Sequence, residues 1–259
     1  MPGLYTTIGP WTVPTFTLAL GVAIAVCVGW GAARLRAAGV APPAAVADAY
    51  LAALAAGLLA ARLGHVILNW NYFADHLDEI IRLQAGGLDW HGGALGALAG
   101  LWLAARWRRL PFAALRDALT PAPPLLALAA WWGCWAAACG YGREVEALWQ
   151  HPAFLVAESA DIYGIVAPRY RVQEWGLALA GLALLAALGL LAANRLPRRR
   201  FWLALLLVSL GVFAVGFLRD DPGLPFGPLR LDQAFDLALA GLSLAGLARP
   251  GALPAAQGG

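Results

Sequence analysis

The segment from Gly86 to Gly100 contains the residues whose types and spacing best fit a chemical site. It reads GGLDWHGGALGALAG and places His91 between two glycine pairs at the start of an apolar run. A histidine at a membrane interface exchanges protons near neutral pH, and adjacent glycines let a lipid headgroup or another backbone approach closely. The alternative is an interfacial histidine beside Trp90, as in aromatic belts. We expect a site, because the small-residue helix face continues through Gly96 and Gly100.

Two arginines stand where a charge needs a partner or a function. Arg62 is near the middle of an apolar run, where a charged side chain costs about 2.5 to 3.5 kcal/mol on insertion scales. His65 and Asn69 follow at helical spacing and share its face. This group is either a polar seam that ties helices together or a site for an anionic ligand. Arg219 ends another run in FLRDDPG, either as a snorkelling arginine beside solvated acids or as part of a site.

The composition places these residues in a membrane. Of the 259 residues, 61% are hydrophobic and 13% are charged, which exceeds what a soluble core requires. Crossing a bilayer takes roughly 20 apolar residues. The apolar runs are 11–33, 50–70, 92–107, 115–138, 175–193, 201–218 and 231–247, of which the third is short and the fourth is interrupted. We therefore predict an all-α integral membrane protein with seven transmembrane helices.

The arginines predict how the helices are oriented. Lysine is absent, and the arginines gather in alternate connections, which the positive-inside rule places in the cytoplasm. These arginines are Arg34, Arg36, Arg106, Arg108, Arg109, Arg116, Arg195, Arg198, Arg199, Arg200 and Arg249. The opposite connections hold most of the acids, so the N-terminus is predicted outside and the C-terminus in the cytoplasm. The net charge of +3 is then an orientation signal, and we expect no nucleic-acid partner.

The pattern predicts a single seven-helix transmembrane domain over residues 1–249. Residues 140–172 form its small extracytoplasmic arm or cap, between the fourth and fifth helices. Residues 250–259 are rich in Pro, Gly and Ala and are predicted to be a disordered tail. The three cysteines, Cys27, Cys134 and Cys139, lie in or beside apolar runs without CxxC spacing. We predict that they are small helix-packing residues and form neither a disulfide framework nor a metal site.

Several motifs follow the order and spacing of one bacterial enzyme family. The strongest are AARLGHVILNWNYF, HLDEIIRLQAGGLDWHGGALGALAG, LAARWRRLPF and DALTPA, which lie between Ala60 and Pro121. Weaker likeness covers IGPWTVPTFTLALG, QEW and FLRDDPG. On these motifs the chain resembles the prolipoprotein diacylglyceryl transferases, seven-helix bacterial enzymes that lipidate lipoprotein precursors.

The resemblance implies a reaction in the bacterial plasma (inner) membrane. An sn-1,2-diacylglyceryl group moves from phosphatidylglycerol to the thiol of the lipobox cysteine in a prolipoprotein signal peptide, and glycerol 1-phosphate leaves. The implied partners are these two substrates and membrane lipid, and no metal or organic cofactor is expected. The thiol must lose its proton, and the leaving phosphate must be held by donors or cations. The resemblance implies His91 and Arg219 as catalytic residues, and as substrate-binding residues Arg62, Gly92, Gly93, Tyr141, Gly142, Arg143 and Glu174.

The chain departs from the family signature at several positions. Trp131 and Cys134 stand where the family has an arginine and an asparagine, Cys139 stands where it has a glutamate, and Phe16 replaces a tyrosine. An indole has one donor and no charge, whereas a guanidinium has five donors and a fixed charge. We expect Arg143 to supply the missing charge. Two alternatives are a catalytically lapsed relative that binds lipid or lipoprotein precursor without transfer, and an unrelated transporter or sensor.

Overall fold

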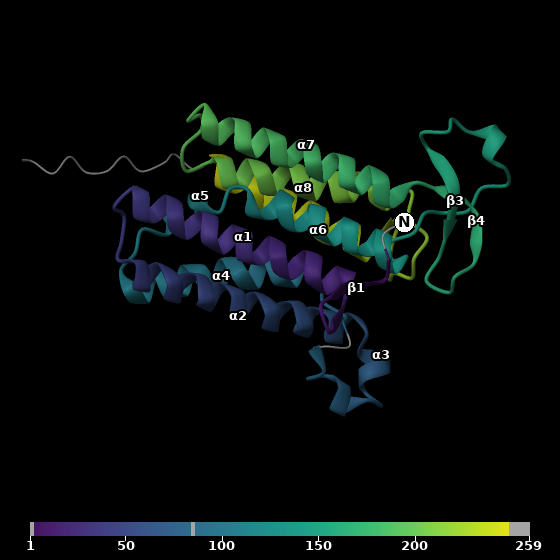
Figure 1. Cartoon of the computed structure of the whole chain (residues 1–259), viewed down its shortest axis with the longest axis horizontal. Coiled ribbons are helices and arrows are strands. Elements are labelled where there is room, and N and C mark those ends of the chain that lie inside the picture. The colour runs from purple at the N-terminus through teal and green to yellow at the C-terminus, as the bar shows by residue number, and fades with distance from the viewer. Residues whose placement is uncertain (1–2, 84–85, 249–259) are drawn as a thin grey trace, which may run out of the picture. The chain divides into compact units, whose positions relative to one another are not determined.

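The computed structural model describes residues 3–83 and 86–248, and these are mostly helical (Figure 1). The longer helices are α1 (Thr15–Ala37), α2 (Pro43–Leu68), α4 (Trp90–Arg108), α6 (Ala122–Ala137), α7 (Val172–Ala192), α8 (Arg200–Gly216) and α9 (Leu231–Ala248). Shorter ones are α3 (Trp70–Phe73), α5 (Phe112–Ala118) and the 3-10 turns η1 (Leu77–Glu79) and η3 (Leu148–Gln150).

Within the described ranges, four helices are long and apolar enough to cross a membrane: α1, α2, α7 and α9. Helix α8 is a shorter apolar helix. Each of the seven apolar runs overlaps one of the longer helices. The structure is therefore that of a mostly helical protein with several candidate membrane spans.

Prolines set two of the helix boundaries. Pro43 occupies the first turn of α2, where its fixed φ fits and its missing N–H costs no hydrogen bond, so that α2 begins before the predicted start at Tyr50. The fourth apolar run divides into α5 and α6, and Pro121 is the N-cap of α6. The predicted interruption of this run is confirmed.

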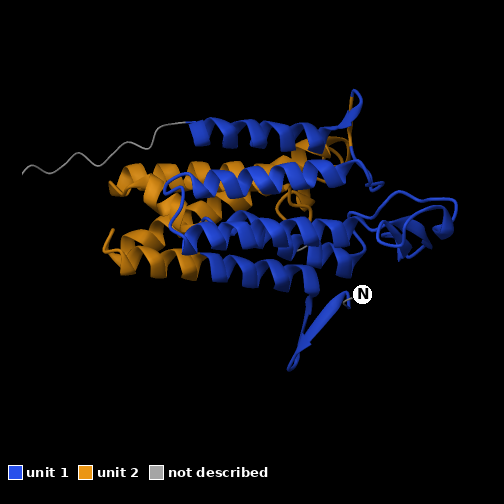
Figure 2. Ribbon diagram, turned by 90° about the horizontal axis from the view of Figure 1, so that it is seen from above, with its two compact units in different colours: residues 1–27, 120–223, 227–259 blue, residues 28–119, 224–226 orange. Residues whose placement is uncertain are grey.

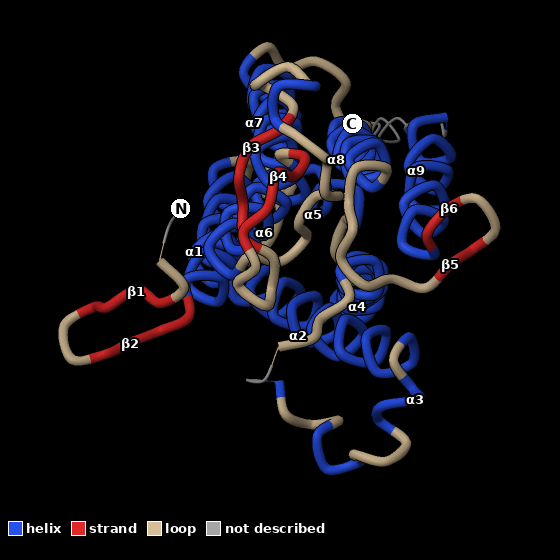
Figure 3. The backbone as a smooth tube through the Cα atoms, turned by 90° about the vertical axis from the view of Figure 1, so that its right-hand side faces the viewer, coloured by secondary structure: helices blue, strands red, loops and turns tan. Residues whose placement is uncertain are grey.

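Short β-hairpins correct the all-α prediction (Figure 3). Strands β1 (Tyr5–Ile8) and β2 (Trp11–Pro14) pair antiparallel, so the residues from Trp11 to Pro14, predicted to begin the first span, are strand instead. The reason is local, because Gly9 has a positive φ and Pro10 follows it at the turn. The hydroxyl of Thr15 then donates to the Gly3 carbonyl at 2.5 Å and ties the hairpin to the start of α1.

The predicted arm over residues 140–172 contains a second hairpin. Strands β3 (Val156–Ala160) and β4 (Val166–Tyr170) pair antiparallel, with Val156 opposite Tyr170. Between α8 and α9 in sequence lie the two-residue strands β5 (Pro225–Phe226) and β6 (Leu229–Arg230). The predicted tail over residues 250–259 and Arg249 lie outside the described residues.

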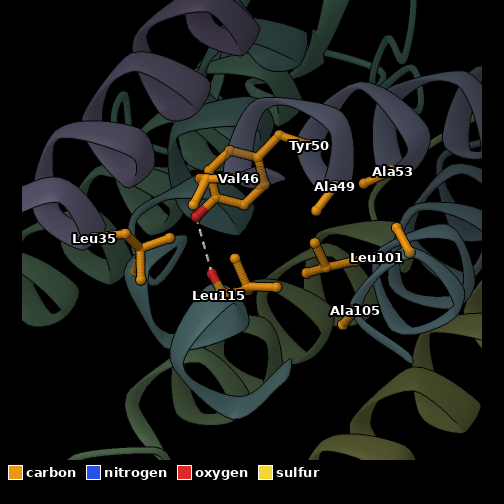
Figure 4. Close-up of a cluster of buried hydrophobic side chains, with 10 residues drawn as sticks. Leu35, Val46, Ala49, Tyr50, Ala53, Leu101, Ala105 and Leu115 are labelled. Atoms are coloured by element: carbon orange, nitrogen blue, oxygen red, sulfur yellow. Dashed lines mark hydrogen bonds between the residues drawn. The ribbon is translucent and has the colours of Figure 1, made fainter. Parts of the chain in front are cut away.

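The chain forms two compact units (Figure 2). Unit 1 contains residues 1–27, 120–223 and 227–259, and unit 2 contains residues 28–119 and 224–226. In unit 2, α2 packs along α4 over a core that includes Leu101 and Leu115, and the Tyr50 hydroxyl donates to the Leu115 carbonyl at 3.1 Å (Figure 4). In unit 1, Trp131, Val172 and Val215 join α6, α7 and α8 in one apolar cluster.

A disulfide joins Cys134 and Cys139, so the prediction that these residues only pack helices was wrong. Helix α6 ends at Ala137, and Ala138 adopts a left-handed conformation with φ 53°. This turn reverses the chain and returns Cys139 to the last helical turn, so that CxxC spacing is not needed. Cys27 is a free, buried cysteine, as expected for a packing residue.

Candidate functional site

In unit 2, the first turn of α4 holds a carboxylate against an imidazole. Asp89 is the N-cap residue, and its Oδ1 accepts a hydrogen bond from the Gly92 amide at 2.7 Å. Its Oδ2 lies 3.0 Å from Nδ1 of His91, a side chain that is almost fully buried. A carboxylate on one ring nitrogen fixes the tautomer and makes the other nitrogen the basic one. The pair is therefore suited to accept a proton.

The ionisation of Asp89 favours this role. Burial by itself would raise the pKa of the Asp89 carboxyl, but the hydrogen bonds with the His91 ring and the Gly92 amide lower it below its ordinary value. The side chain is therefore a carboxylate at neutral pH and stabilises His91 when the ring becomes protonated.

The glycines after His91 pack α4 directly against α2. A Cβ added to Gly92 would lie 2.6 Å from the Ala60 carbonyl oxygen, and one added to Gly96 would lie 2.6 Å from that of Ala56. One added to Gly93 would touch the Cβ of Ala61 at 3.4 Å. These distances leave no room for a side chain at Gly92 and Gly96. The small-residue face thus fixes the start of α4, and with it His91, against α2.

Arg62 binds a loop of its own unit. Its Nε donates to Ile80 O at 2.8 Å, Nη2 donates to Glu79 O at 2.6 Å, and Nη1 donates to Gly86 O at 2.6 Å and to Gly87 O at 3.0 Å. Four of its five N–H groups are used in this way. A phosphate at Arg62 would have to compete with these carbonyls, so the contacts favour the polar-seam interpretation.

His65 shares a face with Arg62 and faces the same loop. Gly87 has a φ of +74°, and a Cβ there would collide with His65 and lie 2.9 Å from Nη1 of Arg62. Both side chains therefore face Gly87, as the helical spacing predicts. Asn69 caps the end of α2 and donates to the His65 carbonyl at 2.9 Å.

In unit 1, the residues from Tyr141 to Arg143 form an extended segment. It lies between residues 218–220 on one side and Tyr170 on the other. The Asp220 amide donates to Tyr141 O at 3.1 Å, and the Arg143 amide donates to Leu218 O at 2.8 Å. On the other side, the Tyr170 amide donates to Arg143 O at 3.1 Å. Gly142 pairs with Arg219, and a Cβ at Gly142 would collide with the Tyr170 carbonyl. The structure therefore brings together four of the predicted site residues: Tyr141, Gly142, Arg143 and Arg219.

Carboxylates neutralise most arginines at this end of unit 1. Arg219 donates to both oxygens of Asp221, at 2.7 and 2.6 Å, and to Asp232 at 3.2 Å. Burial alone would lower the pKa of the Arg219 guanidinium, but its hydrogen bonds and charge pairing with Asp221 raise it above its ordinary value. Arg219 is therefore charged, but its charge is already balanced.

Other arginines nearby are also paired. Arg169 is buried, lies 3.2 Å from Asp161 and 3.6 Å from Glu144, and faces the Tyr141 ring at 5.2 Å. Burial, and next the charge of Asp161, raise the pKa of Tyr141, which keeps its hydroxyl protonated. The pairs that remain are Arg230 with Asp221 and Asp232, and Arg171 with Glu174. Glu174, a predicted substrate-binding residue, is thus held by Arg171.

Arg143 differs from these arginines. Over the residues that the structure covers, it forms no ion pair with a carboxylate, and its exposed guanidinium donates from Nη2 to Phe217 O at 3.0 Å. Its Cζ lies 6.0 Å from the centre of the Tyr170 ring, which is within the range of a cation–π contact. Arg143 is therefore the arginine of this group whose charge is available for an anion.

The signature positions that depart from the family lie in an apolar setting. Trp131 is 8% exposed, and a Cβ added to Gly176 would collide with its indole. Phe16 lies against Gly133 in the same way. The arginine position of the family is thus a packed apolar contact in this chain.

Some residues of these sites were not foreseen. Asp89 carried a signal, because an aspartate before an apolar helix is a typical N-cap. Arg169 and Asp161 carried none, since a hairpin brings them together from eight residues apart.

The chain is similar in sequence to proteins of one bacterial family. The family model described as prolipoprotein diacylglyceryl transferase matches residues 3–249. A phosphatidylglycerol–prolipoprotein diacylglyceryl transferase of Clostridium novyi is 31% identical over 194 residues, covering 73% of this chain and 73% of the relative. Enzymes of the same name from Bacillus cereus and Bacillus anthracis are 30% identical over 220 residues and 31% over 202, each covering 76% of this chain and 73% of the relative. The chain therefore belongs to the prolipoprotein diacylglyceryl transferase family, plasma-membrane enzymes whose membership implies diacylglyceryl transfer from phosphatidylglycerol to prolipoproteins.

Proposed function

We propose that this chain performs the family reaction with the Asp89–His91 pair as proton acceptor and Arg143 as the cation that binds phosphate. The observation that carries the proposal is the 3.0 Å contact between Oδ2 of Asp89 and Nδ1 of His91 at the start of α4. A buried imidazole that is oriented by a carboxylate is a typical general base.

The chemistry assigns one task to each group. His91 takes the proton of the lipobox thiol, because the thiolate is the nucleophile. The sulfur then bonds to the glyceryl carbon, the bond from that carbon to the phosphate oxygen breaks, and glycerol 1-phosphate leaves with the electron pair. Asp89 stabilises the protonated ring, and Arg143 stabilises the charge of the leaving phosphate.

The remaining site residues have supporting tasks in this proposal. Arg62, Gly92 and Gly93 hold the start of α4 in place through α2 and its loop. Tyr141, Gly142 and Arg219 hold the segment that carries Arg143, and Glu174 acts through its ion pair with Arg171. No metal or organic cofactor takes part.

We further propose that α1, α2, α4, α6, α7, α8 and α9 all span the membrane as one domain over residues 1–249. The N-terminus and residues 140–172 then lie outside, and the C-terminus lies in the cytoplasm. The arginine distribution supports this orientation. So does the Cys134–Cys139 disulfide at the end of α6, because disulfides persist on the oxidising side of a membrane.

The test uses purified protein in detergent with phosphatidylglycerol and a synthetic lipobox peptide. Mass spectrometry should show a diacylglyceryl group on the peptide cysteine, and His91→Ala should reduce turnover by about 10² to 10⁴-fold. His76→Ala is the matched control, because this exposed histidine of the same unit contacts its sequence neighbour Tyr72, through the Tyr72 carbonyl and by stacking on the Tyr72 ring. Transfer that persists in His91→Ala would contradict the assigned base.

A second pair of variants tests the phosphate site. Arg143→Gln should raise the KM for phosphatidylglycerol about tenfold, which corresponds to about 1.4 kcal/mol. Arg108→Gln, which alters an exposed arginine in the last turn of α4 that is already paired with Asp48, should leave this KM nearly unchanged. If the wild-type protein binds lipid but shows no transfer, the lapsed relative is the correct interpretation; the apolar setting of Trp131 is the observation that favours it.

A further inference from the structure

The end of α6 makes a turn that its own sequence does not favour. Ala138 has a φ of 53°, and this left-handed conformation is unfavourable for a residue with a Cβ. The amides of Ala138 and Cys139 both donate to the Cys134 carbonyl, the second at 3.0 Å. Glycine is the usual residue at such a position. Here the disulfide between Cys134 and Cys139 closes the same turn covalently.

The turn at Ala138 sets the direction of the segment that carries Arg143. Cys139 O accepts a hydrogen bond from Nε2 of Gln173, a fully buried side chain, at 3.1 Å. Gly140 follows with a φ of +60°, and a Cβ there would lie 3.3 Å from the Trp131 ring. The next residues are those whose amides and carbonyls pair with Leu218, Asp220 and Tyr170. Only three residues separate Cys139 from Arg143.

We propose that the Cys134–Cys139 disulfide is a positioning element for phosphate binding by Arg143, so that full affinity for the lipid requires oxidation of this pair. The inference rests on the proposed function of Arg143. The loop that the bond closes is short, so the bond stabilises the protein less through chain entropy than a bond across a long loop would. The proposal concerns the direction of the segment after α6, which the KM for the lipid reports.

Oxidation of the Cys134 and Cys139 thiols requires an electron acceptor outside the cytoplasm. The two thiols give two protons and two electrons to a disulfide-bearing oxidant of the extracytoplasmic side. Their sulfurs bond to each other, and the disulfide of the oxidant becomes a dithiol. Disulfides form and persist on that side of the membrane.

The first measurement counts free thiols in the full-length protein, which has three cysteines. After denaturation and alkylation without a reductant, mass spectrometry should show one modified cysteine, Cys27; after reduction it should show three. Three modified cysteines without a reductant would overturn the proposal.

The second measurement compares lipid affinity with turnover. Reduction of the wild-type protein, or the double change Cys134→Ala with Cys139→Ala, should raise the KM for phosphatidylglycerol about tenfold and change kcat little. Reoxidation should restore the KM of the wild type but not that of the double variant. Cys27→Ala, the matched control, should behave like the wild type in both redox states.

A third variant separates positioning from a general loss of structure. Adding Ala138→Gly to the double variant should recover part of the lost affinity, because glycine adopts the left-handed turn without penalty. If Arg143→Gln raises the KM while the double variant keeps the wild-type value, the disulfide proposal is wrong and the phosphate site stands. If Arg143→Gln leaves the KM unchanged, the phosphate site itself is wrong, and the disulfide proposal falls with it.

Discussion

Asp89 both caps α4 and holds the ring of His91, since one carboxylate oxygen accepts from the Gly92 amide and the other lies 3.0 Å from Nδ1. The position of the His91 ring is therefore tied to the start of the helix that carries it. A variant that keeps the cap but removes the charge of Asp89 can therefore separate helix capping from the contact with His91.

Asp89→Asn should lower turnover by about tenfold or more while α4 stays capped. An asparagine still offers an oxygen to the Gly92 amide, and Asn is as good an N-cap as Asp. It cannot stabilise a protonated imidazole through its charge. The measurement is kcat of the variant at several pH values, with circular dichroism to check the helix content. Unchanged kcat would show that the charge of Asp89 is not used.

Stability should depend on pH through the same carboxyl. Burial alone would raise the pKa of Asp89. The hydrogen bonds with His91 and Gly92 outweigh this effect, so folding lowers the pKa. A group whose folded pKa is lowered stabilises the protein above its unfolded pKa of about 3.9 and loses this contribution as the pH falls through the folded value. The difference in Tm between wild type and Asp89→Asn should be constant from about pH 7 to 5 and shrink below about pH 4. A constant difference at all pH values would contradict this.

Arg62→Lys should loosen the loop that Arg62 binds. Lysine keeps the charge but cannot reach four carbonyls in a fixed fork, and each lost charged hydrogen bond costs about 1.5 to 3 kcal/mol. Trypsin cleaves after Arg82, which lies within the bound loop, so cleavage there should be several-fold faster in the variant. Cleavage after Arg36, which lies in the last turn of α1, serves as the internal control. Equal rates at Arg82 would favour a lipid-binding role for Arg62.

Gly96→Ala should destabilise unit 2 by about 1 to 3 kcal/mol, as overpacking does in other cores. A Cβ at this position would meet the Ala56 carbonyl at 2.6 Å, and backbone cannot move aside as a flexible side chain can. Gly29→Ala is the control, because nothing lies within 4 Å of a Cβ there. Thermal unfolding in detergent compares the two. Equal stability would contradict the close packing of α4 against α2 at Gly96.

Trp131→Arg should not restore a family phosphate site. The indole is buried against Gly176 in an apolar cluster, and an unpaired guanidinium there costs several kcal/mol. We expect a lower Tm and no gain in transfer. A gain in activity would instead show that the chain is a lapsed enzyme that this position disabled.

Apolar runs predicted the helices because lipid requires long apolar segments whatever the tertiary contacts are. They failed at residues 11–14, where the turn residues Gly9 and Pro10 outweigh apolar composition and make a hairpin. The contacts around His91 were also predictable, since the glycines, the histidine and the N-cap residue are close in sequence. The balance of charges around Arg219 was predictable only in part, because Asp221 is its neighbour in FLRDDPG whereas Asp232 comes from the start of α9. The disulfide depends on the left-handed conformation of Ala138, which no local sequence pattern predicts.

The four carbonyls bound by Arg62 also bear on how the protein is made. A newly synthesised α2 carries a buried guanidinium whose partners, residues 79, 80, 86 and 87, have not yet left the ribosome. Until they arrive, the charge must stay near water, because an unpaired arginine in lipid costs about 2.5 to 3.5 kcal/mol or more. Biogenesis therefore has an order: α2 settles at its final depth only after the loop has been synthesised.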